Sequence, residues 1–373
     1  MFVIEERYDL GKLVTFVPNK NIPVHNWFFF KEGFSRDFVW LMLKEFNLGK
    51  GSWVLDPFLG SGTTALACME VGVNSCGVDS SPLAVFVSQT KTTRYDADLL
   101  EKEADSLFSI PYSKPSLEGL DPLVKRAFSR PVLEDVVFFR DRIAEMEENI
   151  KGFFMLALMR SAMKASYAYK NGGVIKIVKK PTPPFRKFFK RIVKRMIKDV
   201  RSIKLEDCEV RIMLGDARML QLPDDTFDAI ITSPPYLNKI EYTTVYRIEY
   251  ELFLPGVKVD AVRSYLGLNP KNVEDPFPEM DLPIIAKAYF SDMKKALSEM
   301  FRVLKPKGKV ALVVAGGVFP DRVVESDILI ARLAESIGFN VEKIRIVNRR
   351  VATTKRVIKI GEAKESIVYM EKP

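Results

Sequence analysis

One stretch restricts the fold of this 373-residue chain more than any other. Trp53-Val54-Leu55-Asp56 has the apolar character of a buried strand, and the loop Pro57–Thr64, which contains two glycines, follows it. A helical run from Ala65 to Val71 leads to a second apolar strand, Ser75–Asp79, which ends in an acid; another helix begins near Pro82. Strand, glycine loop, helix, strand and acid in this order form the front half of a Rossmann-like nucleotide site. We therefore expect an α/β fold.

The same alternation of strands and helices returns in the C-terminal half. Further strands are expected at Glu209–Leu214, Phe227–Thr232, Lys309–Ala315, Val341–Val347 and Glu365–Met370, with helices at Tyr289–Leu304 and Val324–Ile337. These strands and the first two predict a mostly parallel seven-stranded sheet. Between Trp27 and Phe46 the apolar residues recur at helical spacing, with Ser35 as a candidate N-cap.

Residues 92–205 interrupt this alternation, because their pattern is mostly helical and shows no strand pairs. We expect a helical insertion. The predicted organisation is an N-terminal arm and first part of the catalytic domain at 1–91, a basic helical insertion at 92–205, and the rest of the catalytic domain at 206–373.

The scarcity of two residue types excludes several kinds of site. A single histidine, His25, excludes a His-based zinc site and Ser-His-Asp or Cys-His catalysis, and three cysteines are too few for a disulfide framework, so no metal is expected. No apolar run approaches the ~18–20 residues of a membrane span, and the first residues lack the order of a secretory signal. A cytoplasmic protein without membrane contact is therefore expected; the sequence does not indicate an oligomeric state.

The glycine loop and two strand-end acids are candidate nucleotide contacts. Glycines after a strand let a ligand approach the backbone, and the following helix offers free N–H groups. The loop matches neither a Walker loop nor GxGxxG, so a tight packing turn is the structural alternative. Asp79 stands where such folds place a ribose-binding acid, with a helix N-cap as its alternative. Asp216, after the third candidate strand, is either a loop acid or an adenine contact.

The most specific element is Thr232-Ser233-Pro234-Pro235-Tyr236, which follows the fourth strand. Two prolines fix the backbone and remove two donors, so that neighbouring carbonyls stay free and are held in place. Di-proline loops are common, but packing alone does not account for Ser and Tyr on either side of this one.

DPFLGSGTT followed later by TSPPY resembles the S-adenosylmethionine-dependent amino-methyltransferases, which methylate the exocyclic amine of cytosine (N4) or adenine (N6). The resemblance covers roughly Trp27–Thr90 and Glu209–Pro373, and it implies a Rossmann-like methyltransferase fold with S-adenosylmethionine as cofactor. The tetrapeptide that begins with Ser resembles the cytosine-N4 branch, whereas the adenine branch usually carries Asp there.

The resemblance also implies roles for individual residues. Ser233 Oγ and the Pro234 carbonyl would hold the two amine hydrogens, Pro235 would stiffen the turn, and Tyr236 would stack on the extruded base. Asp79 would hold the cofactor ribose and Asp216 the adenine edge. The implied cofactor-binding set, which includes Ser35 because the segment His25–Ser35 resembles the element bordering the methionine part, is Ser35, Asp56, Phe58, Gly60, Ser61, Gly62, Thr63, Asp79, Asp216 and Ala217.

The net charge of +9 is concentrated in one segment. Twelve basic residues and one acid, Asp199, lie between Lys176 and Lys204, and from Arg186 onward the apolar residues keep a helical period. This helix is a candidate phosphate-binding surface, with an ordinary solvated face as the alternative. A weaker patch comprises Arg349, Arg350, Lys355 and Arg356. The predicted nucleic-acid contacts are Lys187, Lys190, Arg191, Lys194, Arg195, Lys198, Arg349 and Arg350.

Three functions remain open at this point. One is an RNA enzyme, such as the archaeal type that modifies N4 of a ribosomal cytidine. Another is a DNA cytosine-N4 or adenine-N6 methyltransferase of restriction–modification type, and the third is a catalytically silent nucleic-acid-binding module. The basic helical segment is better suited to backbone and shape recognition, and the composition, with two glutamines amid many Lys and Glu residues, resembles that of hyperthermophile proteins. Both features slightly favour rRNA.

Overall fold

A computed structural model describes residues 2–171, 174–237, 245–257, 273–354 and 358–373. Its centre is an eight-stranded sheet in the order β1-β11-β12-β8-β7-β2-β3-β6. Within the described residues, β12 is antiparallel to both of its neighbours and the other neighbouring strands run parallel. The strands are β1 (Ile4–Glu6), β2 (Trp53–Asp56), β3 (Asn74–Asp79), β6 (Val210–Leu214), β7 (Phe227–Thr232), β8 (Leu304–Ala315), β11 (Asn340–Thr354) and β12 (Ile358–Glu371).

The expected Rossmann-like α/β fold is confirmed, and seven of these strands are the predicted ones. The number seven is wrong by one, because the N-terminal β1 pairs in parallel with β11 and adds an eighth strand at the edge. β11 and β12 are also much longer than expected, since they continue as one antiparallel ladder beyond the part that is covered by helices.

Alternating side chains place a hydrophobic layer on each face of the sheet. On β8, Val310, Leu312 and Val314 face the core shared with α11 and α12, whereas Ala311 and Val313 face the core shared with α1 and α2. This is the period of two that a strand buried on both faces requires. The covering helices are α1 (Arg36–Glu45), α2 (Thr63–Met69), α11 (Ile284–Val303) and α12 (Ser326–Ile337).

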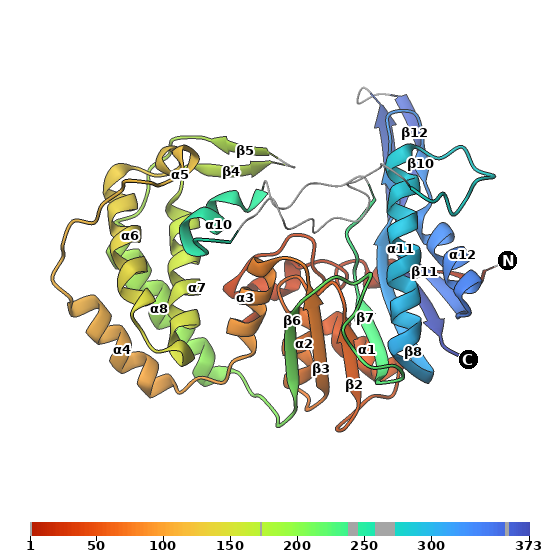
Figure 1. Cartoon of the computed structure of the whole chain (residues 1–373), viewed down its shortest axis with the longest axis horizontal. Coiled ribbons are helices and arrows are strands. Elements are labelled where there is room, and N and C mark those ends of the chain that lie inside the picture. Colours follow the sequence, from red (N-terminus) through yellow and green to blue (C-terminus); the bar gives the residue numbers. More distant parts are fainter. Residues whose placement is uncertain (1, 172–173, 238–244, 258–272, 355–357) are drawn as a thin grey trace.

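A third core lies beside the sheet and belongs mainly to helices (Figure 1). Leu66, Leu83 and Val87 join it, so α2 and α3 connect the helical part to the sheet. Its helices are α3 (Pro82–Thr92), α4 (Ala97–Ser109), α5 (Pro122–Ala127), α6 (Arg130–Ala144), α7 (Glu148–Ala165), α8 (Phe185–Ser202) and α10 (Arg247–Phe253). The domain boundaries at 91/92 and 205/206 stay a prediction.

One local prediction is wrong. The segment 92–205 does contain a strand pair, because β4 (Ala168–Asn171) and β5 (Val174–Ile177) form an antiparallel hairpin. The helix expected after the N-cap Ser35 is confirmed: α1 begins at Arg36, and Ser35 Oγ accepts the Phe38 N–H at 3.2 Å. The aromatic rings before it pack on the helical part, Trp27 on Phe153 and Phe30 on Tyr246.

The remaining elements are short. They are the 3-10 turns η1 (Tyr8–Leu10), η2 (Val17–Asn21) and η3 (His25–Trp27), and the strand pair β9 (Gly317–Val318) and β10 (Val323–Val324). Among the described residues, none of the helices has the length and apolar character that crossing a membrane demands.

Candidate active site

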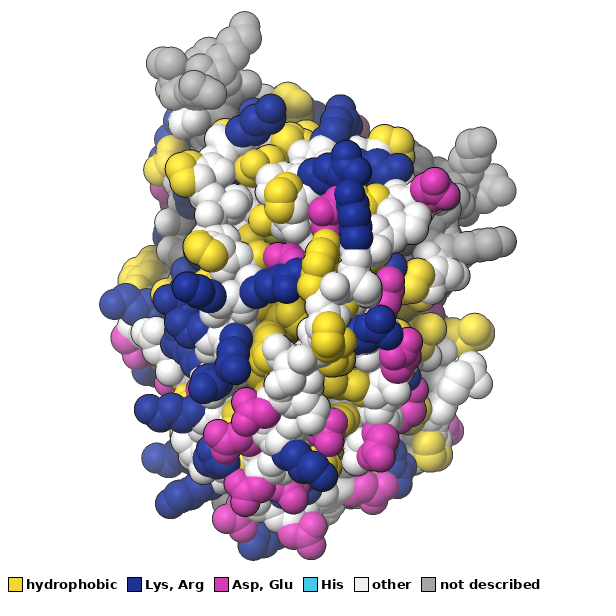
Figure 2. All heavy atoms as spheres, turned by 90° about the vertical axis from the view of Figure 1, so that its left-hand side faces the viewer, with side chains coloured by type: hydrophobic (Ala, Val, Ile, Leu, Met, Phe, Trp, Pro, Cys, Tyr) yellow, Lys and Arg dark blue, Asp and Glu magenta, His cyan; other side chains and the backbone are white. Residues whose placement is uncertain are grey.

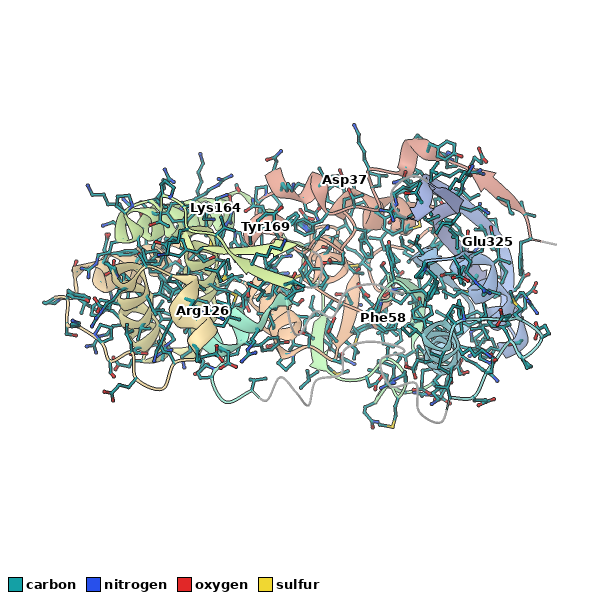
Figure 3. All side chains as sticks on the ribbon, turned by 90° about the horizontal axis from the view of Figure 1, so that it is seen from above. Asp37, Phe58, Arg126, Lys164, Tyr169 and Glu325 are labelled. Atoms are coloured by element: carbon teal, nitrogen blue, oxygen red, sulfur yellow. The ribbon has the colours of Figure 1, made fainter. Side chains whose placement is uncertain are left out.

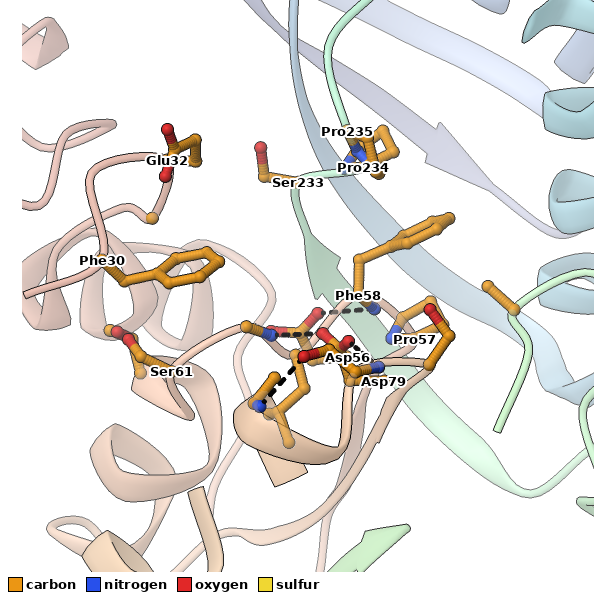
Figure 4. A pocket seen from close by; sticks show the side chains of 18 of the residues that line it. Phe30, Glu32, Asp56, Pro57, Phe58, Ser61, Asp79, Ser233, Pro234 and Pro235 are labelled. Atoms are coloured by element: carbon orange, nitrogen blue, oxygen red, sulfur yellow. Dashed lines mark hydrogen bonds between the residues drawn. The ribbon is translucent and has the colours of Figure 1, made fainter. Parts of the chain in front are cut away.

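The loops that follow β2, β3, β6 and β7 surround one cavity at the carboxyl edge of the sheet (Figure 4). This is the edge at which open α/β sheets bind ligands. Most of the residues predicted for the cofactor and for catalysis line it: Asp56, Phe58, Gly60, Ser61, Thr63, Asp79, Asp216, Ala217, Ser233, Pro234, Pro235 and Tyr236. Figure 4 shows Asp56 and Asp79 together on one side of the cavity and Ser233, Pro234 and Pro235 on the other.

Two predicted residues do not line the cavity. Ser35 is fully buried, and its hydroxyl is engaged in capping α1. Gly62 lies at the start of α2 with φ +75°, and a Cβ there would come within 2.8 Å of Ser88 Oγ. Both residues therefore support the glycine loop and the segment before α1 without lining the cavity.

The backbone at Gly60 is built for close approach. Its φ of +56° lies in the left-handed region, and a Cβ would meet the Phe30 ring at 2.9 Å. Next to it, the Ser61 hydroxyl is buried and has no hydrogen-bond partner among the described residues, although it borders the cavity. A buried unpartnered hydroxyl in a cavity wall is available to a polar ligand atom or to an ordered water.

Asp79 holds the glycine loop against the next strand. Its two carboxylate oxygens accept the N–H groups of Gly60 and Ser81, each at 2.8 Å. The alternative role of helix N-cap belongs to Ser81, whose Oγ accepts the Ala84 N–H at 3.2 Å. Desolvation raises the pKa of Asp79 to about 6, against the opposing effect of the two backbone donors.

Asp56 connects three elements through its buried carboxylate. Thr232 Oγ1 donates to one oxygen at 2.6 Å, Thr64 Oγ1 donates to the other at 2.7 Å, and Phe58 N donates at 3.2 Å. Burial raises its pKa to about 6, although these hydrogen bonds lower it. Asp56 thus ties the strand before the glycine loop to the strand before Ser233.

Asp216 is paired inside the protein. Arg218 binds both of its carboxylate oxygens, with the shortest contact at 2.7 Å, and also reaches Asp292 at 3.0 Å. Desolvation opposes the lowering of its pKa, but the hydrogen bonds from Arg218 outweigh it, so the pKa of Asp216 lies below its ordinary value. Asp216 is therefore an ionised acceptor at the cavity wall at neutral pH.

The hydroxyl oxygen of Ser233 is a hydrogen-bond acceptor at the cavity wall. Its hydroxyl donates its hydrogen to the Val313 carbonyl at 3.1 Å on the neighbouring strand β8. A hydroxyl has one hydrogen and two lone pairs, so a further partner of Ser233 Oγ is bound by acceptance. The Tyr236 hydroxyl donates to Glu365 Oε1 at 2.8 Å, which anchors the tyrosine to β12.

An aromatic wall and one acid were not named from the sequence, although most of them lie in the segment His25–Ser35 that was expected beside the cofactor. Phe28, Phe30 and Tyr246 line the cavity, and the Phe30 ring stacks on Tyr246 with centroids 6.2 Å apart and planes 8° from parallel. Glu32 lines it as well, on the same side as Ser233 in Figure 4. The run of three phenylalanines before Lys31-Glu32 was the available signal, but its pairing with Tyr246 spans more than two hundred residues of sequence.

The basic helix exists as predicted, over Phe185–Ser202, with its apolar side in the third core. Lys187, Lys194 and Lys198 are exposed and have no ion pair within the described part of the chain. Others are partly engaged: Lys190 lies 3.9 Å from Asp105, and Arg186 and Arg201 have acidic partners. Lys and Arg side chains gather along one flank of the helical face (Figure 2).

The second basic patch is weaker than the sequence indicates. Arg349 is paired with Glu6 and Glu362, whereas Arg350 is exposed without an ion pair among the described residues. Lys355 and Arg356 lie outside the described residues. No group of three or more metal-ligating side chains occurs in the described ranges.

Comparison with known proteins identifies relatives along the whole chain. A family model of the N6 and N4 enzymes, described as DNA methylase, matches residues 37–89. The chain is 27% identical over its full length to the Type II methyltransferase M.BsoBI of Geobacillus stearothermophilus, covering 90% of that protein. It is 25% identical to the Type II methyltransferase M.AvaI of Nostoc sp., with 90% of this chain and 83% of that protein covered. The Type II methyltransferase M.MjaII of Methanocaldococcus jannaschii is 23% identical, with 74% and 68% covered.

Proposed function

We infer that this chain, which belongs to the S-adenosylmethionine-dependent amino-methyltransferases, methylates the exocyclic N4 amine of cytosine in DNA. The observation that carries the inference is a single cavity that brings the glycine loop and Asp79 together with Ser233–Tyr236. The DNA substrate is supported by the match to a DNA methylase family and by the Type II relatives. The RNA substrate that the sequence slightly favoured has less support.

The cavity fits S-adenosylmethionine as the cofactor. Asp79 supplies a carboxylate for ribose hydroxyls, Asp216 an acceptor, and Ser61 an unpartnered hydroxyl among the described residues. The glycine backbone at Gly60 leaves room where any side chain would collide. When bound there, the cofactor supplies an activated methyl group on a positively charged sulfur.

Ser233 and Pro234 are proposed to orient the target amine. The lone pair of an exocyclic amine is delocalised into its ring, so the amine is a poor nucleophile. Ser233 Oγ, which already donates its hydrogen to Val313, and the Pro234 carbonyl accept the two amine hydrogens and favour a pyramidal nitrogen. Its lone pair then points toward the methyl donor. The methylated ammonium is acidic, so its proton leaves without a strong base.

Aromatic side chains are proposed to hold the extruded cytosine. Tyr236, which is hydrogen-bonded to Glu365, borders the cavity beside Ser233. Phe30 and Tyr246, which stack on each other, also line the cavity. Enzymes that modify a base extrude it and stack it on such rings. The choice of N4-cytosine over N6-adenine rests on Ser rather than Asp at position 233.

The proposed nucleic-acid contacts are cations of α8, namely the exposed Lys187, Arg191, Lys194, Arg195 and Lys198 and the partly exposed Lys190, with Arg350 as an outlying one. Arg349 is a weaker candidate because two acids already bind it. Contacts of this kind bind the backbone without reading sequence. The alternative of a catalytically silent binding module finds no support in a cavity that contains both motifs.

One assay tests this function directly. The protein is incubated with methyl-labelled S-adenosylmethionine and either unmethylated genomic DNA or rRNA, and the polymer is then digested to nucleosides for mass spectrometry. We expect label in N4-methyldeoxycytidine. Label in N6-methyldeoxyadenosine would overturn the base assignment, and label in RNA alone would overturn the DNA assignment.

A further inference from the structure

A second, larger cavity opens beside the candidate active site. Its volume is about 830 Å³, and it lies between the segment 27–32, helices α7 and α8, strand β4 and the start of α10. Phe28, Glu32 and Tyr246 line both cavities, so the two share a wall. We call this second cavity the lateral groove. When one unit of a polymer occupies the active-site cavity, the lateral groove is therefore next to the units that flank it.

Cations dominate the polar lining of the lateral groove. Arg160 and Lys164 are four residues apart on α7, and Arg191 and Arg195 are four apart on α8, so each pair lies on one face of its helix. Lys31 and Lys170 complete the set. The acids in the described lining are Glu32 and Glu249, and Glu249 is paired with Lys170.

Two of these cations repel each other. Burial, and then the nearby charge of Arg195, lower the pKa of Arg160, and the guanidinium of Arg160 donates to Asn26 Oδ1 at 3.0 Å. The buried carboxylate of Asp199 acts on the pKa of Arg160 in the opposite direction to Arg195, and it accepts a hydrogen bond from Trp27 Nε1 at 3.0 Å. Like charges held close on packed helices α7 and α8 are relieved when an anion lies between them.

Aromatic rings form the apolar part of the same lining. Trp27, Phe28, Phe29, Phe188 and Tyr246 contribute to it. The Arg191 guanidinium lies 5.2 Å from the centroid of Phe188, and the Lys170 ammonium lies 3.9 Å from that of Tyr246. Cations beside aromatic faces are the arrangement with which proteins bind single-stranded nucleic acid, because phosphates meet the charges and bases meet the rings.

We propose that the lateral groove holds the DNA strand immediately next to the extruded cytosine, with its phosphates between the α7 and α8 cation rows and a flanking base on the aromatic wall. The proposal rests on the proposed function. It separates the basic helix into two roles: Arg191 and Arg195 face the groove, whereas Lys187, Lys194 and Lys198 do not line it. Figure 3 shows Lys164 near Tyr169 of β4 on the helical side, and Phe58 of the active-site cavity toward the middle of the molecule.

The test uses a single-stranded 12-nucleotide oligodeoxycytidine and the full chain. Fluorescence anisotropy across a KCl series gives the affinity and its salt slope for wild type, for Arg191→Gln with Arg195→Gln, and for Arg160→Gln. The matched control is Lys125→Gln with Arg126→Gln, two exposed cations on α5 that do not line the groove. The double groove variant loses two exposed charges, so it does not depend on a repacked core.

We expect the groove pair to lower the salt slope by about 1.4, since each lost contact to a single strand removes about 0.7. Arg160→Gln should lower it by about half as much, and the control should match wild type. A groove pair with the wild-type slope, or a wild type that does not bind the strand, would overturn the proposal. Methylation of genomic DNA by the wild type is measured separately. If no methylation is found, the proposed function is wrong, and this result is distinct from the outcome of the binding test.

Discussion

The proposed contact between Asp79 and the cofactor predicts that cofactor affinity depends on pH in one direction. Its carboxylate is the proposed acceptor for the ribose hydroxyls, and desolvation raises its pKa to about 6. A raised carboxyl pKa means that the charged form predominates above pH 6 and is lost as the pH falls through that value. Only the charged form accepts hydrogen bonds with both oxygens. Affinity for S-adenosylmethionine should therefore fall as the medium becomes more acidic.

The size of the effect follows from the ionised fraction. With a pKa of about 6, roughly one-tenth of Asp79 is ionised at pH 5 and roughly nine-tenths at pH 7, so the dissociation constant should rise about tenfold between pH 7 and pH 5. Asp79→Ala should weaken binding at pH 7 by about 10- to 150-fold, the equivalent of a charged hydrogen bond of about 1.5–3 kcal/mol. It should also remove the pH dependence.

Isothermal titration calorimetry at several pH values measures both quantities. Asp56 is the necessary comparison, because burial raises its pKa to about 6 as well. If Asp79→Ala keeps the tenfold change and Asp56→Asn abolishes it, the titrating group is Asp56 and the reasoning about Asp79 is wrong. An Asp79→Ala protein that is folded by circular dichroism and binds with wild-type affinity would remove Asp79 from the site.

Four further outcomes are expected. Ser233→Ala should slow single-turnover methyl transfer by roughly 10²–10³ without changing cofactor affinity, as measured by nucleoside mass spectrometry; a full-rate variant would refute the acceptor role. Tyr236→Ala should weaken capture of the base by about 1–3 kcal/mol in a DNA-binding assay, whereas Tyr236→Phe keeps the ring and loses the hydrogen bond to Glu365. Lys91→Met should weaken cofactor binding, because the buried Lys91 Nζ donates to the Ser61 carbonyl at 2.6 Å. Desolvation lowers the pKa of Lys91 to about 7 from 10.5, so the unfolded chain holds more protons between these values and stability should rise with pH there in urea unfolding; Lys91→Met should remove that rise.

The sequence predicted those elements that local interactions determine. The strand β7 over Phe227–Thr232 and the cap at Ser35 were predicted correctly, because an apolar run and an N-cap hydroxyl are local signals. The β4–β5 hairpin carried such a signal too, since Gly172-Gly173 separates two short runs with strand-forming residues in the sequence, but the surrounding helical pattern obscured it.

Contacts between distant segments were beyond local patterns. The stacking of Phe30 on Tyr246 depends on how the helical part closes on the loop before α1, and nothing local to either residue encodes it. The charge of α8 was visible, but its division between the lateral groove and solvent was not. That division depends on the packing of α8 against α7, a contact between distant segments that places the charge of Arg195 within reach of Arg160.

Asp56 shows how the fold couples cofactor and substrate. The family resemblance implied a direct cofactor contact for Asp56, which stays a prediction; in the structure it lines the cavity, and both of its oxygens also accept hydrogen bonds from the protein. One donor is Thr64 of α2, the helix that follows the glycine loop. Another is Thr232, which immediately precedes Ser233. In-line methyl transfer needs the amine and the methyl donor to be held in one geometry, and small displacements reduce the rate strongly. Because one buried carboxylate fixes the loop that holds the cofactor and the strand that presents Ser233, a shift of either would strain the same hydrogen bonds. We therefore propose that Asp56 contributes to catalysis by keeping the two loops in register.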